Sequence, residues 1–419
     1  MQDVLKRRAD EARARAYATP LDRFHVGDPE LFRTDTLWPW FERLRQEDPV
    51  HHTAESEFGP YWSVTRHRDI IAVDSNHRVF SSDSEIGGIT IHEGRQPREQ
   101  SSFIALDPPD HDRQRKVIAP MFAPPSLVIL EPLIRERAAK ILDELPRGET
   151  FDFVDKVAVE LTSQMLATLF DFPFAERRLL PRASDLILSP IGPDGIVQTE
   201  EQRQLELFNT LGKFVALWNE RLALPPAHNL ISMLCHDAAT RKDAPENYLG
   251  NIILLIVAGS DTTRHSITGG LLALNENPAE YDKLRADPAL IETMVPEIIR
   301  WQSPVAHMRR TALEDIELGG KRIRRGDKVV MWYVSGNRDE DAIERPDDFL
   351  IDRERPRQHV SFGFGIHRCV GMRLAEMQLR IMWEEILRRF PRIDVVGEPK
   401  RMNSNFVKGY EAMPVRIAS

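Results

Sequence analysis

The segment from Phe362 to Gly371, FGFGIHRCVG, constrains this chain more than any other part of its sequence. A phenylalanine, glycines and Cys369 stand at fixed offsets immediately before an apolar pattern of helical period. Glycine allows sharp backbone turns and the close approach of a bulky planar group. A cysteine at the start of a helix lies near unpaired N–H groups and the positive end of the dipole, which favour the thiolate. The segment therefore predicts one thiolate presented on a tight loop.

A single thiolate held in this way is suited to ligate heme iron. The alternative is a buried structural cysteine, because free cysteines are among the most buried residues; the surrounding glycines argue against it. Gly363 and Gly365 lack the third glycine of a dinucleotide-binding fingerprint. Cys235 is the only other cysteine, so a disulfide framework and a four-cysteine zinc site are excluded, and a reducing cytoplasm is expected.

The composition is that of a folded globular protein. The 419 residues are 42% hydrophobic and 29% charged, which excludes disordered, collagen-like and coiled-coil chains. A net charge of −9 argues against a nucleic-acid partner. Met1 to Pro20 lacks the apolar core of a secretory signal, and the apolar run Ile252 to Ala258 is far shorter than the roughly 20 residues of a membrane span. We expect a cytoplasmic protein without a transmembrane anchor.

Helical periodicity dominates, with short strand-like patches between the helices. Helices are predicted over 151–170, 249–274 and 372–390, and strands over 61–65, 316–323 and 328–334. Turn residues predict irregular segments at 81–100 and 188–200, which either gate a pocket or merely connect helices. The expected fold class is mainly α with a small β region (α+β). We expect an N-terminal extension over 1–30 and a single domain over 31–419.

The Cys369 segment resembles the heme-thiolate loop of cytochrome P450 monooxygenases, and other motifs follow in the order of that family. Glu297-Ile-Ile-Arg300 resembles the ExxR pair, and Arg353 the arginine that completes its triad. The sequence AGSDTT at 258–263 resembles the oxygen-activating motif of the long central helix. The resemblance spans nearly the whole chain and implies the cytochrome P450 fold, one large helical domain that encloses heme b.

The resemblance also implies the residues that contact the cofactor. His111 and Arg115 resemble the HxxxR pair that meets the heme propionates, and Arg310 and His367 match two further propionate positions. Because buried carboxylates need charge-assisted partners, donors from separate segments meet that need. Cys369 is the implied axial ligand of the iron. Further implied cofactor contacts are Ala258, Gly259, Phe362, Gly363 and Gly371.

Spacing gives each motif a physical interpretation. Glu297 and Arg300 share a helix face, so a buried pair joined by Arg353 would serve folding and heme retention. Pro296 predicts a kink or a late helix start.

The oxygen-activating motif has its own spacing argument. Ala258 and Thr262 also share a face, where the Thr262 hydroxyl competes for the Ala258 carbonyl and bends the helix. We expect Thr262 to hydrogen-bond bound dioxygen and Asp261 to relay protons from solvent. The alternative is an ordinary Ser/Thr-rich helix with a solvated Asp261.

The chain shows no flavin, nicotinamide or iron–sulfur motif, so the resemblance implies electrons from a [2Fe–2S] ferredoxin and its NAD(P)H-dependent reductase. A basic docking surface is expected on the thiolate side, or else an ordinary solvated cluster. Its residues are Arg113, Arg115, Lys116, Arg368, Arg373 and Arg380.

Within the family, segments such as Trp62-Ser-Val-Thr-Arg66 and Trp301-Gln-Ser-Pro304 resemble bacterial alkane and fatty-acid terminal hydroxylases. This branch implies that O2 supplies one oxygen atom to the terminal C–H bond of medium-chain n-alkanes or fatty acids. A narrow apolar channel would then be needed. Expected wall residues are Leu254, Val305, Ala306, Met308 and Phe406.

Three alternatives remain open. The first is a heme-thiolate monooxygenase that acts on another small hydrophobic substrate, such as a terpenoid or fatty-acid derivative. The second is a peroxide-driven peroxygenase or a non-oxygenating isomerase, for which the proton path through Asp261 and Thr262 would be superfluous. The third is a heme-based sensor, which normally needs an output domain.

Overall fold

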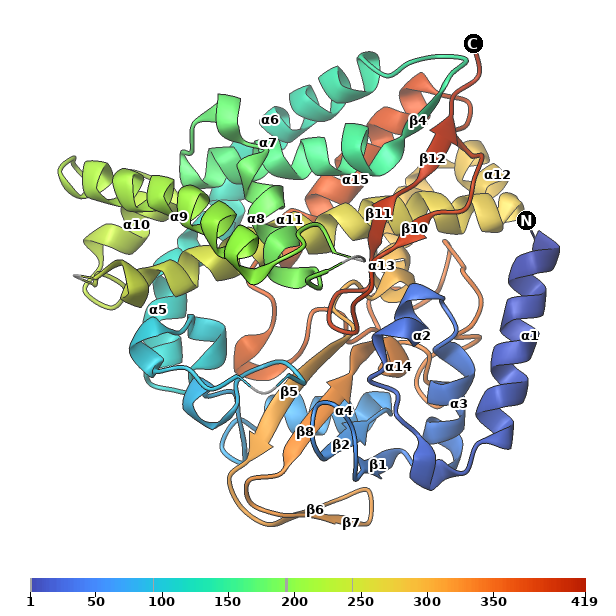
Figure 1. The fold of residues 1–419 in the computed structure, drawn as a ribbon. Coiled ribbons are helices and arrows are strands. Elements are labelled where there is room, and N and C mark those ends of the chain that lie inside the picture. The colour runs from blue at the N-terminus through green and yellow to red at the C-terminus, as the bar shows by residue number, and fades with distance from the viewer. Residues whose placement is uncertain (1, 93, 193–194, 243) are drawn as a thin grey trace.

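The computed structural model describes residues 2–92, 94–192, 195–242 and 244–419. Its centre is α11 (Pro245–Glu276), a helix of 32 residues that begins with proline at its first position and runs through the middle of the molecule (Figure 1). The α-helices that pack most extensively on it are α7 (Glu160–Phe170), α8 (Leu179–Leu188), α13 (Ile291–Gln302) and α15 (Met372–Arg389). Their apolar faces form the largest core cluster.

The remaining helices surround this group. They are α1 (Gln2–Ala18), α2 (Pro29–Arg33), α3 (Trp38–Glu47), α4 (His67–Ser75), α5 (Asp110–Ile118), α6 (Pro124–Asp143), α9 (Glu200–Leu222), α10 (Leu230–His236), α12 (Pro278–Ala286) and α14 (Tyr333–Gly336). Helix α1 packs against α3, and the Arg43 guanidinium of α3 donates to the Ala16 carbonyl at 2.8 Å. The division between residues 1–30 and 31–419 stays a prediction.

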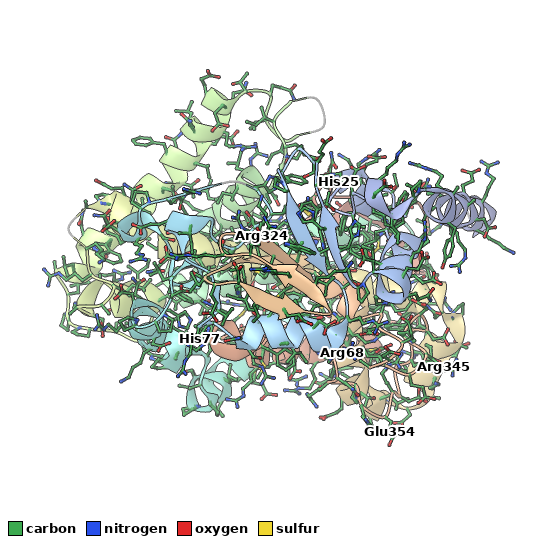
Figure 2. The ribbon with its side chains drawn as sticks, turned by 90° about the horizontal axis from the view of Figure 1, so that it is seen from below. His25, Arg68, His77, Arg324, Arg345 and Glu354 are labelled. Carbon is green, nitrogen blue, oxygen red and sulfur yellow. The ribbon has the colours of Figure 1, made fainter. Side chains whose placement is uncertain are left out.

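A five-stranded sheet in the order β1-β2-β8-β5-β3 lies at one end of the molecule. Its strands are β1 (Val50–Thr53), β2 (Tyr61–Val64), β8 (Lys328–Trp332), β5 (His307–Ala312) and β3 (Phe80–Ser81). Strands β2 and β8 are parallel, and the other pairs are antiparallel. Seen from below, α4 lies across this sheet with Arg68 and His77 near its two ends (Figure 2). The sheet therefore supports the loops that border the site.

Smaller pairings complete the β region, which confirms the expected α+β class. These are the three-stranded sheet β4-β12-β9 and the pairs β6-β7 and β10-β11. The strands are β4 (Thr150–Asp152), β6 (Ile316–Leu318), β7 (Lys321–Ile323), β9 (Asp394–Val395), β10 (Lys400–Arg401), β11 (Tyr410–Ala412) and β12 (Pro414–Arg416).

Most predicted elements are confirmed, and the helix expected over 151–170 is wrong in its first half. The helix expected over 151–170 begins as strand β4, continues as a π-helix over Val154–Val159 and becomes α-helical only at α7. Residues 150–152 form a strand because they pair with β12, which is more than 250 residues away, and the local sequence pattern does not indicate such a contact. Of the two alternatives for Pro296, the late start is excluded, because α13 begins five residues earlier, at Ile291, and the proline lies inside it. The kink stays a prediction.

Within the described residues no single helix has both the length and the apolarity to cross a membrane. One bent pair, Asp110–Phe122 with Pro124–Asp143, meets that criterion by length and composition alone.

Candidate active site

A cavity of about 800 Å³ lies between α11, α15, the Cys369 loop and the segments around 89–104 and 404–407. This volume is within the range of small-molecule and cofactor sites. Its walls are largely apolar. Among the residues that line it are Leu254, Val257, Val305, Met308, Phe406 and Val407.

Cys369 lies on a loop that ends where α15 begins. The Cys369 N–H donates to the Phe362 carbonyl at 2.8 Å, which closes the loop, and Gly371 caps α15. The Cys369 side chain is accessible from the cavity. Its surroundings within the protein raise the pKa of the Cys369 thiol by desolvation, whereas the Gly371 N–H, Arg115 and Arg368 act in the opposite direction. The loop thus presents a sulfur with donors and cations around it.

The glycines of this loop are required by backbone geometry. Gly363 and Gly365 have φ values of +65° and +64°, in the left-handed region that favours glycine. A Cβ at Gly365 would lie 2.6 Å from the Asp74 carbonyl oxygen, so the end of α4 passes directly against the loop. The motif is therefore explained by a contact with a segment almost 300 residues earlier in the chain as well as by the turn.

The wall formed by α11 has the expected hydroxyl arrangement. Thr262 Oγ1 donates to the Ala258 carbonyl at 2.9 Å, which confirms the predicted competition for that carbonyl. Ala258, Gly259 and Thr262 all line the cavity. A Cβ at Gly259 would lie 2.7 Å from Leu166 of α7, so helix packing is a second reason for this small residue.

Asp261 is not solvated: its side chain is fully buried. One carboxylate oxygen lies 2.6 Å from Arg264 Nη2, and the other accepts a hydrogen bond from Ser184 of α8 at 2.7 Å. Arg264 also contacts Asp185, whose side chain is one-third exposed. Burial raises the pKa of Asp261 to about 6, although the Arg264 charge opposes this rise. A continuous polar chain thus leads from Asp261 towards the surface.

The donors expected to meet carboxylates lie together beside the cavity. The rings of His111 and His367 are 4.4 Å apart, and Arg115, Arg310 and His367 line the cavity. His111 Nε2 and His367 Nδ1 are buried without a hydrogen-bond partner among the described residues. Burial lowers the pKa of both histidines. Such orphaned ring nitrogens are costly unless a ligand satisfies them.

These residues fit heme, a planar group that carries two carboxylates. A carboxylate beside the two rings would accept hydrogen bonds from both. For His111, whose Nδ1 contacts Asp112 Oδ1 at 2.8 Å, this requires the imidazolium form, which a carboxylate stabilises. His367 Nε2 contacts Ser82 Oγ at 2.9 Å, which leaves its Nδ1 available as a donor. The donors, the cavity and the sulfur therefore suit one cofactor.

The ExxR triad is a buried ion-pair network. Arg300 donates twice to Glu297, both at 2.7 Å, and Arg353 Nε donates to Glu297 at 2.9 Å. Arg300 also donates to the carbonyl of Asn337, whose side chain binds the Val360 N–H and the Ser361 hydroxyl. The network thereby connects α13 to the segment that leads into the Cys369 loop.

Four of the five expected wall residues line the cavity: Leu254, Val305, Met308 and Phe406. The expectation for Ala306 is wrong. Ala306 is fully buried in a separate cluster with Phe32 and Trp332, because the backbone turns it away from its neighbour Val305. Its N–H donates to the Phe406 carbonyl at 2.9 Å, so it holds a wall segment without forming the wall.

The predicted irregular segment 81–100 borders the cavity. Ile89, Thr90, His92, Gln96 and Gln100 line it, and Gln96 and Gln100 are exposed. This segment rests on α11, since a Cβ at Gly250 would lie 2.6 Å from the Gln100 carbonyl oxygen.

Several positioning residues escaped prediction. His307 of β5 contacts the Ile91 N–H at 3.1 Å and the Asn405 carbonyl at 2.9 Å, which ties together two wall segments. Burial lowers the pKa of His307 to about 3, so the ring is neutral. Ser184 and Asp74 have no sequence signal, because their partners are distant in the chain. Arg264 had one, its three-residue spacing from Asp261.

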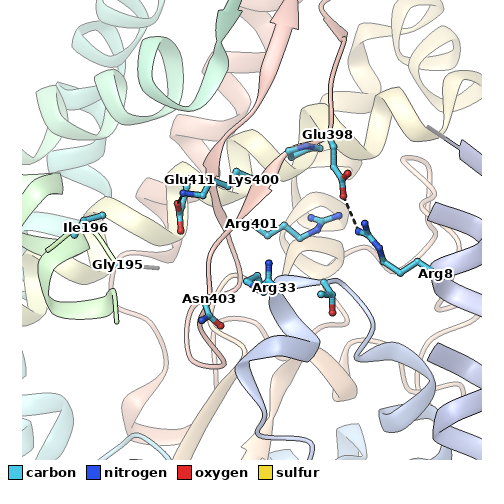
Figure 3. Close-up of a pocket in the computed structure, with 11 residues that line it drawn as sticks. Arg8, Arg33, Gly195, Ile196, Glu398, Lys400, Arg401, Asn403 and Glu411 are labelled. Carbon is cyan, nitrogen blue, oxygen red and sulfur yellow. Dashed lines mark hydrogen bonds and ion pairs between the residues drawn. The ribbon is translucent and has the colours of Figure 1, made fainter. Parts of the chain in front are cut away.

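A second hollow of about 460 Å³ lies between α1, α2 and the β10-β11 pair (Figure 3). Each cation that lines it already pairs with a carboxylate, so its charges satisfy one another. The pairs are Arg8–Glu398, Arg33–Glu30, Lys400–Glu411 and Arg401–Asp35.

Known proteins resemble the chain over nearly its whole length. The family model "Cytochrome P450" matches residues 195–409. The solved structure of CYP153D17 from Sphingomonas sp. PAMC 26605 is 45% identical, with a TM-score of 0.87 over 96% of this chain and 100% of that chain. Linalool 8-monooxygenase of Pseudomonas putida is 36% identical over 94% of this chain and 99% of its own length. A methyl-branched lipid omega-hydroxylase of Mycobacterium tuberculosis is 30% identical over 96% and 97%.

The architecture agrees with these matches. The long central helix, the cysteine loop ahead of α15 and the buried Glu297 network occur together in one chain. The chain therefore belongs to the cytochrome P450 family, whose members are monooxygenases that use heme b.

Proposed function

We propose that this protein inserts one oxygen atom of O2 into the terminal C–H bond of medium-chain linear substrates, n-alkanes or fatty acids. The observation that carries the proposal is an apolar cavity that contains both the Cys369 side chain and the Thr262 hydroxyl. The sequence resemblance to bacterial terminal hydroxylases supplies the substrate class. Bound heme supplies the oxygen-activation chemistry, and the protein supplies its ligand, protons and orientation.

Each part of the site has an assigned task. Cys369 provides the thiolate ligand of the iron, and Arg115, Arg310, His111 and His367 bind the propionates. The nearby cations and the Gly371 N–H stabilise the charge on the sulfur.

The proton path has a separate place on α11. Thr262 holds a hydroxyl at the cavity wall. Asp261 binds and releases the proton, and Arg264 pairs with both its carboxylate and that of Asp185, which is one-third exposed, so the buried acid lies one ion-pair step from solvent.

The electrons come from a ferredoxin and its NAD(P)H-dependent reductase in this proposal. Arg113, Lys116, Arg368 and Arg373 are exposed on and beside the segments that carry the propionate donors and Cys369. Arg380 is part of a pair of ion bridges with Glu131 and Glu384, so its charge is largely compensated. A basic surface here would speed the association of an acidic protein more than it would strengthen the complex.

A second substrate class is an acyclic terpenoid, hydroxylated at a chain-end methyl group. The similarity to linalool 8-monooxygenase favours it, and the lipid omega-hydroxylase points to chain ends as well. Incubating the reconstituted system with matched n-alkanes, fatty acids and acyclic terpenoids, followed by product analysis, separates the two classes. Oxidation at internal carbons only would contradict both.

The thiolate assignment is tested by the visible spectrum of the reduced holoprotein under carbon monoxide. We expect the red-shifted Soret band of a thiolate complex, and its loss in Cys369→Ala. Cys235→Ala is the matched control, because Cys235 is buried in α10 and does not line the cavity. A red-shifted band that survives Cys369→Ala would overturn the assignment.

A further inference from the structure

Asp74, at the end of α4, is a buried carboxylate that three other elements share. Its Oδ1 lies 2.6 Å from Arg310 Nη2 of β5. Its Oδ2 accepts hydrogen bonds from the Tyr333 hydroxyl of α14 at 2.9 Å and from the Phe364 N–H of the Cys369 loop at 2.7 Å. The Asp74 side chain is 1% exposed and that of Arg310 3%.

The Cys369 loop is shaped around this carboxylate. A Cβ at Gly363 would lie 3.0 Å from Asp74 Oδ2 and 3.3 Å from the Tyr333 oxygen. The next glycine, Gly365, passes closer still to the Asp74 main chain, with 2.6 Å from such a Cβ to the Asp74 carbonyl oxygen. One acid therefore fixes both the strand that carries Arg310 and the first half of the loop that carries Cys369.

The ion pair also changes the charge of the cavity. Arg310 lines the cavity at the end where His367 and Arg115 lie, and its guanidinium is paired with Asp74 in a region removed from water. Charges interact much more strongly there than at the surface. Removing the Asp74 carboxylate would take away a negative charge that lies beside the Arg310 guanidinium, and the net charge near the cofactor would become more positive.

We propose that Asp74 is a positioning residue for Arg310 and the Cys369 loop, and that its negative charge lowers the reduction potential of the heme iron. Reduction adds an electron at the iron, so nearby negative charge opposes it and nearby positive charge favours it. Charge and hydrogen bonding around the cofactor are among the means by which a protein sets this potential. The inference rests on the heme site and is independent of the substrate proposed above.

The test is a spectroelectrochemical titration of the substrate-free holoprotein. Asp74→Asn keeps the size of the side chain and removes its charge, so we expect a positive shift of the potential. Tyr333→Phe removes one donor to Asp74 and leaves the charge less neutralised, so we expect a negative shift. Asp74→Glu should stay closest to wild type. The opposite signs matter, because a merely loosened site would shift the potential of both variants in one direction.

Asp339→Asn is the matched control. Asp339 is also a buried carboxylate at an end of α4, where it accepts the His67 N–H, and it does not line the cavity. We expect the reduction potential of the heme iron in Asp339→Asn to remain that of wild type.

Equal shifts in Asp74→Asn and Asp339→Asn, or shifts of the same sign in Asp74→Asn and Tyr333→Phe, would overturn the proposal. If Asp74→Asn does not retain heme, an unchanged potential in Tyr333→Phe overturns it. The carbon monoxide spectrum of wild type reports separately whether the thiolate assignment holds.

Discussion

Thr262 and Asp261 are neighbours in the sequence, but their side chains leave α11 in different directions. Both residues border the cavity; the Thr262 hydroxyl is bonded to its own helix, whereas the Asp261 carboxylate is bonded to Ser184 of α8. Two neighbouring residues of α11 therefore serve different sides of the helix: Thr262 places a hydroxyl at the cavity wall, and Asp261 places an acid on the side of α8.

Replacing Thr262 with alanine removes the hydroxyl at the cavity wall and leaves the apolar volume almost unchanged. We expect the ratio of product formed to NAD(P)H consumed to fall severalfold, while electron consumption continues. Quantifying both in one assay checks this, with Thr262→Ser, which keeps a hydroxyl, retaining most of the coupling. Wild-type coupling in Thr262→Ala would refute the role.

Asp261 gives the protein a specific pH dependence of stability. Because its pKa in the folded protein is about 6, above the ordinary value near 3.8, the folded state binds the proton more tightly than the unfolded state. The contribution of Asp261 to stability therefore declines as pH rises from about 4 to about 6. The Tm of Asp261→Asn should rise relative to wild type across this window in scanning calorimetry, and a constant difference would contradict the assigned pKa.

The contacts of a single residue could be predicted where its partner lies three or four positions away on the same helix. The Thr262–Ala258 bond and the Glu297–Arg300 pair follow from positions on one helix turn. Asp74 and His307 act through partners more than 90 residues away, and an isolated acid or histidine in the sequence carries no mark of such contacts. The burial of Asp261 could not be predicted from the sequence for the same reason, because the helix that covers it, α8, is distant in the chain.

At the scale of elements, the Glu297 network joins α13 to the chain that leads into the cysteine loop. Glu297→Gln leaves Arg300 and Arg353 without their carboxylate, and breaking a buried pair in this way costs about 3–5 kcal/mol. We expect a large loss of stability and of bound heme, measured as Tm and as Soret absorbance per protein. Glu30→Gln, in the half-exposed pair with Arg33, should cost no more than about 1 kcal/mol. Full heme retention in Glu297→Gln would contradict the structural role.

Elements with strong local periodicity were predictable, and elements made by distant pairing were not. The apolar stripes of α11 and α15 indicate helices from their own sequences. Strand β4 exists because residues 150–152 pair with Pro414–Arg416, a contact between opposite ends of the chain. The small strands β10 and β11 likewise depend on partners, so propensity alone leaves them as loops.

For the molecule as a whole, charge at the cavity mouth bears on which substrates enter. Glu246, in the first turn of α11, is exposed and lines the cavity, whereas the arginines among the described lining residues, Arg115 and Arg310, lie with the propionate donors. Glu246→Lys should tighten fatty-acid binding by about fivefold, a surface-charge effect of about 1 kcal/mol. The affinity for an n-alkane of equal length should not change. Soret titrations with both ligands measure this, and equal changes for both would contradict it.

At Gly250, the segment 94–100 at the edge of the cavity rests on α11, the helix that forms the cavity wall. Main chain meets main chain there, and the side chains of 94–100 are exposed, so the seat of this segment depends on few of them. The exception is Arg98, whose Nε donates to the buried carboxylate of Asp83 at 2.6 Å. Libraries that vary the other positions while Gly250 and Arg98 are kept can therefore explore new substrate ranges without disturbing the buried residues beneath.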